Sequence, residues 1–291
     1  MKSRMMRSVG ALALVALSGG ALLAAEQTVG TGKDFKGPVG LQLYSLRDSF
    51  KQDVPGTLDK VQAMGFKYVE LAGTYGITPA AFRQELEARG LVPVAGHFSF
   101  EQYDKNVDAV IREATALGLQ YVGCAWVPHQ GDFTEMDAHR TIEVFNRAGR
   151  ALAAHGLKFY YHNHGYEFQP HGKSTLMDFI IRGTDPEYVA FQMDLLWTKF
   201  PGEDPAKWLA KYPGRWVLMH LKDLKKGVEG NLSGGTDVRN DVTLGTGQID
   251  FANVLKAAKA SGTKWYFIED ESPSVEIQVP NSLRFLEQLA W

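Results

Sequence analysis

From residue 39 onward, short apolar segments alternate with longer segments in which apolar residues recur at helical spacing. The short segments are apolar on both faces, which is typical of a parallel sheet covered by helices. Several of the helical segments end in glycine, as helix C-termini favour. The pattern predicts eight strands, at residues 39–45, 67–71, 91–97, 120–126, 157–164, 188–194, 215–220 and 264–269.

Eight strand–helix units in one pass predict an α/β fold, a single-domain (β/α)8 TIM barrel over residues 38–291. The alternative is an open doubly wound sheet. That fold usually carries a GxGxxG turn after its first strand, whereas the chain has "GLQLYSLRD" there. The barrel is therefore the favoured prediction.

The longest irregular stretch, residues 222–250, follows the seventh predicted strand. A connection of that length in a compact domain is usually functional, so we expect a lid or a substrate loop. Its "LSGG" and "LGTG" glycines have the composition of a phosphate cradle. We favour a loop-shaping role for them, with Asp250 capping the next helix.

The N-terminus has the layout of a secretory signal peptide. Lys2, Arg4 and Arg7 precede an apolar stretch that ends in small residues around Ala25. A membrane anchor is the alternative, but the apolar stretch is shorter than the ~20 residues of a spanning helix. We expect residues 1–25 to be a signal peptide and residues 26–37 a flexible lead-in. The mature protein is then periplasmic or secreted, with no stable membrane insertion after signal cleavage.

Composition narrows the function classes. The chain has 291 residues, a formal net charge of -2 and no basic cluster, so it carries no electrostatic footprint for nucleic acid. Its single cysteine, Cys124, excludes an intrachain disulfide. Because Cys124 lies in the apolar run "YVGCAW", we interpret it as a small core residue rather than a nucleophile.

Acidic and histidine side chains gather where the predicted strands end. They are Glu70, His97, His162, His164, Glu167, Asp194, His220 and Glu269. Barrel enzymes place their chemistry at the carboxyl ends of the strands. Burying so many ionisable groups together requires a compensating cation, so the pattern predicts a metal site.

The chain also resembles a known family, the xylose isomerase-like barrel proteins known as sugar phosphate isomerases/epimerases, which include tagatose 3-epimerase and inosose dehydratase. The resemblance runs from Val39 to the end of the chain. It is carried by "GLQLYSLRD", "YHNHGYEF", "QMDLLW", "MHLKD" and "LGTGQIDF". Members of this family bind one divalent metal through two glutamates, an aspartate and a histidine. The resemblance implies Glu167, Asp194, His220 and Glu269 as these ligands, with Glu271 as an alternative for the last.

Three carboxylates and one imidazole suit Mn²⁺, Mg²⁺ or Co²⁺, and Zn²⁺ is also compatible with this set. A structural zinc site would use cysteines, which the chain lacks apart from Cys124. A metal with open positions polarises a carbonyl and stabilises the charge that forms when the neighbouring carbon loses its proton.

The chain departs from the tagatose-type epimerases in one segment. Those enzymes carry a histidine soon after the aspartate, where this chain has "DLLWTKF". Lys222, two residues after His220, is a candidate acid/base or oxyanion partner, since a desolvated lysine near a metal can have a lowered pKa. Its alternative is a solvated loop lysine. His97, His162 and His164 are the other candidate catalytic residues.

Glu70, Trp126 and Trp197 are candidate substrate-binding residues near strand ends. Aromatic residues in such places serve equally well as core or as platforms on which sugars stack. The family resemblance implies a small-molecule carbohydrate or polyol as the partner. The expected signal peptide favours an unphosphorylated one, because phosphorylated sugars are mainly cytoplasmic.

These observations together predict an exported, metal-dependent sugar isomerase/epimerase that abstracts a proton next to a carbonyl. The alternative is a lyase or dehydratase that eliminates a β-leaving group from a keto-sugar, a 3-keto-glycoside or an inosose. A non-catalytic sugar-binding barrel is the second alternative. An apurinic-site endonuclease would need more zinc ligands and basic DNA-facing loops, which the sequence does not show.

The signal peptide gives the first testable prediction. Mass spectrometry of native protein from the periplasm or medium is expected to find an N-terminus close to Glu26, because the basic, apolar and small-residue pattern ends at Ala25. Native protein that still carries Met1 or Lys2 would refute the prediction.

Overall fold

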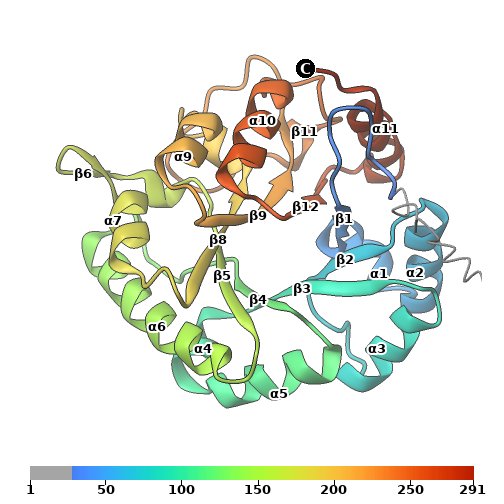
Figure 1. Cartoon of the computed structure of the whole chain (residues 1–291), viewed down its shortest axis with the longest axis horizontal. Coiled ribbons are helices and arrows are strands. Elements are labelled where there is room, and N and C mark those ends of the chain that lie inside the picture. Colours follow the sequence, from blue (N-terminus) through green and yellow to red (C-terminus); the bar gives the residue numbers. More distant parts are fainter. Residues whose placement is uncertain (1–27) are drawn as a thin grey trace, which may run out of the picture.

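The structure is a computed structural model that describes residues 28–291, so the predicted signal peptide lies outside the described residues. Eight parallel strands close into a barrel in the order β1-β12-β9-β8-β5-β4-β3-β2 (Figure 1). They are β1 (Val39–Gln42), β2 (Tyr68–Leu71), β3 (Val92–Phe98), β4 (Tyr121–Cys124), β5 (Lys158–His162), β8 (Val189–Asp194), β9 (Trp216–Leu221) and β12 (Trp265–Ile268). All eight predicted strands and the predicted (β/α)8 barrel are confirmed.

Helices form a ring outside the strands (Figure 1). The longer ones are α2 (Val54–Ala63), α3 (Pro79–Glu87), α5 (Val107–Leu117), α6 (Glu135–Ala153), α7 (Leu176–Gly183), α9 (Pro205–Lys211), α10 (Phe251–Ser261) and α11 (Val275–Gln288). Shorter ones are η1 (Leu43–Leu46), α1 (Arg47–Phe50), α4 (Phe100–Lys105), η2 (Tyr166–Phe168), α8 (Leu195–Lys199) and η3 (Val238–Asn240). Their boundaries follow local chemistry: Thr134 caps the start of α6, and α5 ends at Gly118 in the left-handed conformation. Within residues 28–291, no helix is both long and apolar enough to cross a membrane.

The inside of the barrel is filled by its own small apolar cluster. Tyr121, Tyr160, Leu218 and Phe267 belong to this cluster, which is separate from the larger core between the strands and the helices. Gly123 allows the packing, because a Cβ atom there would lie 2.2 Å from the Tyr160 ring. The interior is thus closed below, and polar side chains collect above it at the carboxyl ends of the strands.

The described part of the predicted lead-in, residues 28–37, is not free of the barrel. Phe35 is buried, and its ring centroid lies 5.0 Å from that of Tyr266. The Gly30 amide donates to Glu287 of α11, and the Trp291 amide donates to Asp34. This segment therefore differs from the expected flexible lead-in, because burial of an aromatic ring fixes it to the barrel.

The long connection after β9 forms a structured excursion over the barrel. Two short strands, β10 (Asp223–Leu224) and β11 (Asp241–Val242), pair antiparallel, and residues 225–240 extend beyond them. A second small hairpin, β6 (Pro170–His171) with β7 (Ser174–Thr175), follows η2. The long loop that was predicted to be functional is therefore closed at its base by the pairing of β10 with β11.

The buried Asp223 carboxylate holds the base of this excursion. It accepts hydrogen bonds from the backbone amides of Gly245, Gly247 and Ile249 at 2.9, 2.8 and 3.2 Å. The amides of the "LGTG" glycines thus bind an internal carboxylate, and Asp250 caps α10 by accepting from the Asn253 amide. The predicted loop-shaping role is confirmed for the glycines of "LGTG".

Cys124 is fully buried in the large core, and burial raises the pKa of its thiol to about 12. A thiol in this environment is not a nucleophile at neutral pH, because the thiolate is the reactive form. The interpretation of Cys124 as a core residue is confirmed.

The anchor at Asp223 gives a stability prediction. Asp223→Ala is expected to lower the free energy of unfolding by about 1–3 kcal/mol, because it leaves buried amide donors without an acceptor. Hydrogen exchange at Gly245, Gly247 and Ile249 should accelerate in the same variant. Glu229→Ala, an exposed position in the same loop, is the matched control. Equal unfolding free energies for the two variants would contradict the anchoring role.

Candidate metal centre and active site

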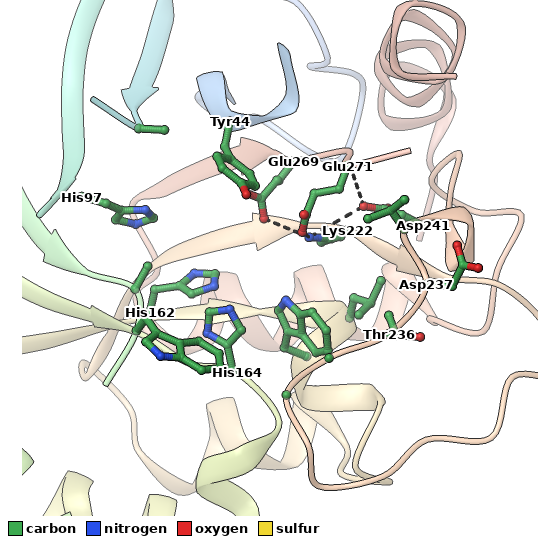
Figure 2. A pocket seen from close by; sticks show the side chains of 18 of the residues that line it. Tyr44, His97, His162, His164, Lys222, Thr236, Asp237, Asp241, Glu269 and Glu271 are labelled. Atoms are coloured by element: carbon green, nitrogen blue, oxygen red, sulfur yellow. Dashed lines mark hydrogen bonds and ion pairs between the residues drawn. The ribbon is translucent and has the colours of Figure 1, made fainter. Parts of the chain in front are cut away.

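A cavity of about 740 Å³ opens at the carboxyl ends of the strands (Figure 2). Its lining comes from the ends of several strands and from the long loop after β9. The lining residues are Tyr44, Ala72, His97, Ser99, Ala125, Trp126, His162, His164, Leu196, Trp197, Lys222, Gly234, Gly235, Thr236, Asp237, Val238, Asp241, Glu269 and Glu271. Its position matches the location of active sites in barrel enzymes.

Asp194, His220 and Glu269 form a compact group whose ligand atoms lie within 4.8 Å of one another. Asp194 and His220 end neighbouring strands and are aligned in the β8–β9 register, and Glu269 follows β12, the next strand. The His220 Nδ1 atom lies 3.2 Å from Glu269 Oε2 and 3.6 Å from Asp194 Oδ2. All three residues are buried.

The donor atoms in this group fit a divalent metal. Asp194 Oδ1 accepts from the Trp197 amide, whereas the buried Asp194 Oδ2 has no hydrogen-bond partner among the described residues. A buried carboxylate oxygen without a partner is costly unless a cation binds it. Two carboxylates and an imidazole match the oxygen- and nitrogen-rich sets that bind Mn²⁺, Co²⁺ or Zn²⁺.

Glu70 orients His220 from below. Its Oε2 lies 2.5 Å from His220 Nε2, and its carboxylate also accepts hydrogen bonds from Gln192 and from the Tyr160 hydroxyl. With Nε2–H donated to Glu70, the His220 Nδ1 lone pair points toward Asp194 and Glu269. Carboxylate–histidine–metal arrangements of this kind are common in metal sites.

The structure therefore corrects the prediction that Glu70 binds substrate. Glu70 is fully buried, and it does not line the cavity. Burial alone would raise its pKa, but the imidazoles of His220 and His97 hold the pKa of Glu70 well below its usual range. Glu70 is thus a permanent anion inside the barrel rather than a group that contacts the ligand.

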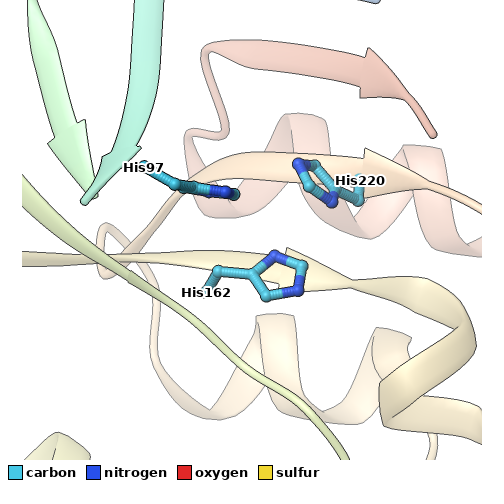
Figure 3. A group of neighbouring side chains, drawn as sticks. All are labelled: His97, His162 and His220. Carbon is cyan, nitrogen blue, oxygen red and sulfur yellow. The ribbon is translucent and has the colours of Figure 1, made fainter. Parts of the chain in front are cut away.

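Three of the predicted histidines lie next to one another (Figure 3). His97, His162 and His220 place ring nitrogens within 4.8 Å of one another. The Gln192 Oε1 atom lies 3.0 Å from His162 Nδ1 and 3.3 Å from His97 Nε2, so one amide orients both rings. His162 and His164 lie side by side, 4.9 Å between ring centroids, on the β5 side of the cavity (Figure 2).

We refer to Asp194, His220 and Glu269 as the metal group. Glu167, by contrast, does not belong to it. Its Oε1 accepts hydrogen bonds from the Tyr161 hydroxyl at 2.5 Å and from the His164 amide at 2.8 Å. Burial raises the pKa of Glu167 to about 7. The assignment of Glu167 as a metal ligand is therefore corrected, because its carboxylate is used to hold the turn after β5.

The residue of this segment that lies beside His220 is His162. β5 ends at His162, whereas Glu167 lies five residues further on, in η2. The His162 ring centroid is 4.6 Å from that of His220, beside the proposed ligands. Applying the strand-end rule strictly would have selected His162 as the candidate metal neighbour instead of Glu167.

Lys222 is buried and surrounded by acids, which excludes the alternative of a solvated loop lysine. Its Nζ lies 2.5 Å from Glu271 Oε1, 3.1 Å from Glu269 Oε2 and 3.7 Å from Asp241 Oδ2. Burial alone would lower the pKa, but these carboxylates raise the pKa of Lys222 well above its usual value. The expected lowered pKa is corrected, and Lys222 is an ammonium ion in this structure.

Asp241 is a candidate site residue that the sequence pattern did not indicate. It lies in β11, at the return of the long loop, where it lines the cavity and accepts a hydrogen bond from the Glu271 amide. No strand-end rule points to it, because its position depends on the fold of the loop. Glu271, considered as a possible ligand, instead pairs with Lys222 (Figure 2).

Both predicted tryptophans line the cavity. Trp126 follows β4 and is 45% exposed, with its ring against those of His164 and Tyr166. Trp197, in α8, is mostly buried, and the Lys222 Nζ lies 5.8 Å from its ring centroid. Trp126 is thus an accessible aromatic surface, and Trp197 is part of the cavity wall.

Comparison with known proteins agrees with the barrel fold. Residues 58–291 match the family model described as xylose isomerase-like TIM barrel. An inosose dehydratase from Bacillus cereus (strain AH820) is 26% identical over 244 residues, which are 74% of this chain and 80% of the relative. An inosose dehydratase from Geobacillus thermodenitrificans is 32% identical over 148 residues, about half of each chain.

Solved structures of similar shape share the barrel. A sugar phosphate isomerase/epimerase from Parabacteroides distasonis has a TM-score of 0.73 at 24% identity, covering 90% of this chain and 96% of the other. A second from the same species has a TM-score of 0.70 at 27% identity, covering 86% and 98%. The IolI protein, whose structure has a binding zinc atom, has a TM-score of 0.65 at 12% identity, covering 86% and 95%.

The donor group gives a metal-binding prediction. Asp194→Ala is expected to lose stoichiometric divalent metal, because it removes a carboxylate that faces His220 and Glu269. Glu167→Gln is the matched control: it also alters a buried carboxylate beside the cavity, but is expected to retain the metal. Elemental analysis of both folded variants checks this, and metal loss in Glu167→Gln or full metal in Asp194→Ala contradicts it.

Proposed function

Since the chain belongs to the family of xylose isomerase-like TIM barrels, we propose that it is a divalent-metal-dependent enzyme that removes a proton next to a carbonyl of an unphosphorylated carbohydrate or polyol. Asp194, His220 and Glu269 are the residues that would hold the metal. When bound, a divalent metal polarises the substrate carbonyl and stabilises the negative charge that develops on it.

The charges lining the cavity support an unphosphorylated substrate. The cavity is lined by four carboxylates, from Asp237, Asp241, Glu269 and Glu271, and among the described lining residues the only lysine or arginine is Lys222. That ammonium is already paired with three of these carboxylates. A phosphate would meet net negative charge here, whereas sugar hydroxyls can donate hydrogen bonds to the same oxygens. An unphosphorylated substrate also fits the proposed export to the periplasm or medium.

The observation that carries the proposal is the asymmetry of the two cavity walls around the metal group. One wall carries the Lys222 ammonium with Glu269 and Glu271, and the facing wall carries the imidazoles of His162 and His164 (Figure 2). A two-glutamate epimerase mechanism needs a carboxylate on each side of the substrate carbon. Glu167, which the family resemblance implied for the second side, is turned away.

The imidazole wall offers proton acceptors. Burial lowers the pKa of His162 well below its usual value and that of His164 to about 3, so both rings are neutral. His164 Nδ1 has no hydrogen-bond partner among the described residues, and His162 is held in position by Gln192. A positioned neutral imidazole can take a proton as a general base.

The opposite wall offers a proton donor. Lys222 is an ammonium that reaches the cavity, and its carboxylate partners keep it charged. Such a group can protonate a departing oxygen. A base on one wall and an acid on the other suit the removal of a proton followed by expulsion of a β-leaving group. We therefore place a lyase or dehydratase reaction first, in line with the inosose dehydratase relatives.

Isomerisation or epimerisation is the second candidate. Like elimination, it begins with removal of the proton next to the carbonyl. It differs because a proton then returns to the substrate and no group is expelled. The Parabacteroides distasonis protein with 27% identity, named a sugar phosphate isomerase/epimerase, favours this outcome. NMR and mass spectrometry of candidate keto-sugars in deuterated water separate the reactions. Elimination removes the mass of the leaving group, isomerisation keeps the carbon skeleton and its substituents, and a pure sugar-binding barrel gives no proton exchange.

The assignment of Lys222 as a proton donor gives a kinetic prediction. Lys222→Met is expected to lose at least ~100-fold in turnover, the lower end of what a general acid or base contributes. Exchange of the substrate proton with deuterated water should fall less than turnover, because the proton acceptor lies on the other wall. Both rates are measured by NMR on the metal-loaded protein.

Lys226→Met is the matched control, since Lys226 is an exposed lysine in the same loop. It is expected to keep wild-type turnover. If Lys222→Met lost exchange and turnover in parallel, Lys222 would take part in the first step, contrary to this assignment. Wild-type turnover in Lys222→Met would remove Lys222 from the mechanism.

A further inference from the structure

The mouth of the cavity exposes an unusual share of the large hydrophobic side chains. In residues 28–291, six such side chains are exposed: Tyr44, Val92, Trp126, Met136, Val238 and Ile277. Three of them, Tyr44, Trp126 and Val238, line this one cavity. Single exposed hydrophobic residues need no explanation, but their convergence around a polar site marks a binding surface.

These three side chains surround the cavity mouth. Tyr44 follows β1, Trp126 follows β4, and Val238 lies in η3 of the loop after β9. In the barrel order, β2 and β3 separate β1 from β4, and β5 and β8 separate β4 from β9. The three residues therefore come from separate sectors of the barrel rim rather than from one continuous patch.

Trp126 is held rigidly although its side chain is 45% exposed. Its ring stacks on His129 with centroids 5.3 Å apart and an interplanar angle of 26°. Tyr166 and His164 pack against it in edge contacts at 4.8 and 5.2 Å. A fixed aromatic ring loses little conformational entropy when it stacks on a ligand, which favours binding. Through His164, Trp126 also contacts the imidazole wall of the cavity.

Tyr44 is supported in a similar way on the other side. Its amide donates to Gln42 Oε1 at 3.0 Å, and the Arg47 guanidinium lies 4.6 Å from the ring centroid. Arg47 is itself held by the Glu271 carbonyl oxygen. Tyr44 lies next to Glu269 in the cavity (Figure 2). It therefore also borders a proposed metal ligand.

The size of the cavity leaves space beyond the metal group. Its volume of about 740 Å³ lies in the upper part of the ~300–1,000 Å³ range of pockets that bury drug-sized ligands. A single sugar ring bound beside Glu269, the one proposed metal ligand that lines the cavity, would leave part of this space to Tyr44, Trp126 and Val238. The lining also includes polar groups from Ser99, Thr236 and Asp237.

We propose that Tyr44, Trp126 and Val238 form an outer subsite for a second sugar ring, so that the substrate is a glycoside of at least two rings. Aromatic faces bind the C–H face of a sugar ring, and the neighbouring hydroxyl and carboxylate oxygens accept hydrogen bonds from its hydroxyl groups. This combination favours a sugar ring over a purely apolar group. The proposal rests on the proposed function only for the position of the reacting ring.

Calorimetric titration of the metal-loaded protein tests the outer subsite with sugars that lack the reacting carbonyl. Methyl glucoside is compared with the methyl glycosides of cellobiose, maltose and sophorose, in which the anomeric carbon is also blocked. At least one disaccharide is expected to bind about tenfold more tightly than methyl glucoside, as one good stacking contact provides. In Trp126→Ala this advantage should fall to about twofold or less. Met136→Ala, which removes an exposed hydrophobic side chain that does not line the cavity, should keep it.

Three outcomes overturn the proposal. The first is that no disaccharide binds more tightly than methyl glucoside, including the case in which none binds measurably. The second is that folded Trp126→Ala keeps the full advantage. The third is that phenyl glucoside binds more tightly than every disaccharide, which would assign the outer subsite to an aromatic group. This binding assay needs no turnover. A lack of proton exchange would therefore refute the proposed function and leave the proposal of an outer subsite unaffected.

Discussion

The contact between Glu70 and His220 inside the barrel is the interaction on which the geometry of the site depends. The Glu70 Oε2 atom lies 2.5 Å from His220 Nε2. The other ring nitrogen, Nδ1, therefore faces Asp194 and Glu269. A buried carboxylate is stable here because imidazole, amide and hydroxyl donors surround it. The apolar cluster below closes the barrel, so this polar layer rests on a rigid base.

Charge balance explains the arrangement above that layer. Asp194 and Glu269 face a position where a divalent cation fits, and Lys222 compensates Glu269, Glu271 and Asp241 on one side. The other side is built from neutral imidazoles, so the two walls differ in charge and in protonation state. The proposed proton donor and proton acceptor therefore lie on opposite sides of the cavity.

The loop after β9 connects the metal group to the cavity mouth. Asp223 fixes its base through three backbone amides, and Asp241 brings its return strand to Lys222. Val238, between these points, is exposed and lines the same cavity as Trp126. One segment therefore contributes both to the charge balance of the inner site and to the surface proposed for a second sugar ring.

The sequence by itself determined the barrel, because strand and helix periodicity is local and repeated in every unit. It also predicted that Asp194, His220 and Glu269 lie close together, since residues at the carboxyl ends of parallel strands meet at one edge of the sheet. The tertiary structure decided the rest. Glu167 turned toward Tyr161 instead of the metal group, because the direction of a side chain after a strand depends on the turn that follows. The charge state of Lys222 depended on Asp241 and Glu271, which are distant in sequence and become neighbours only when the loop after β9 folds back.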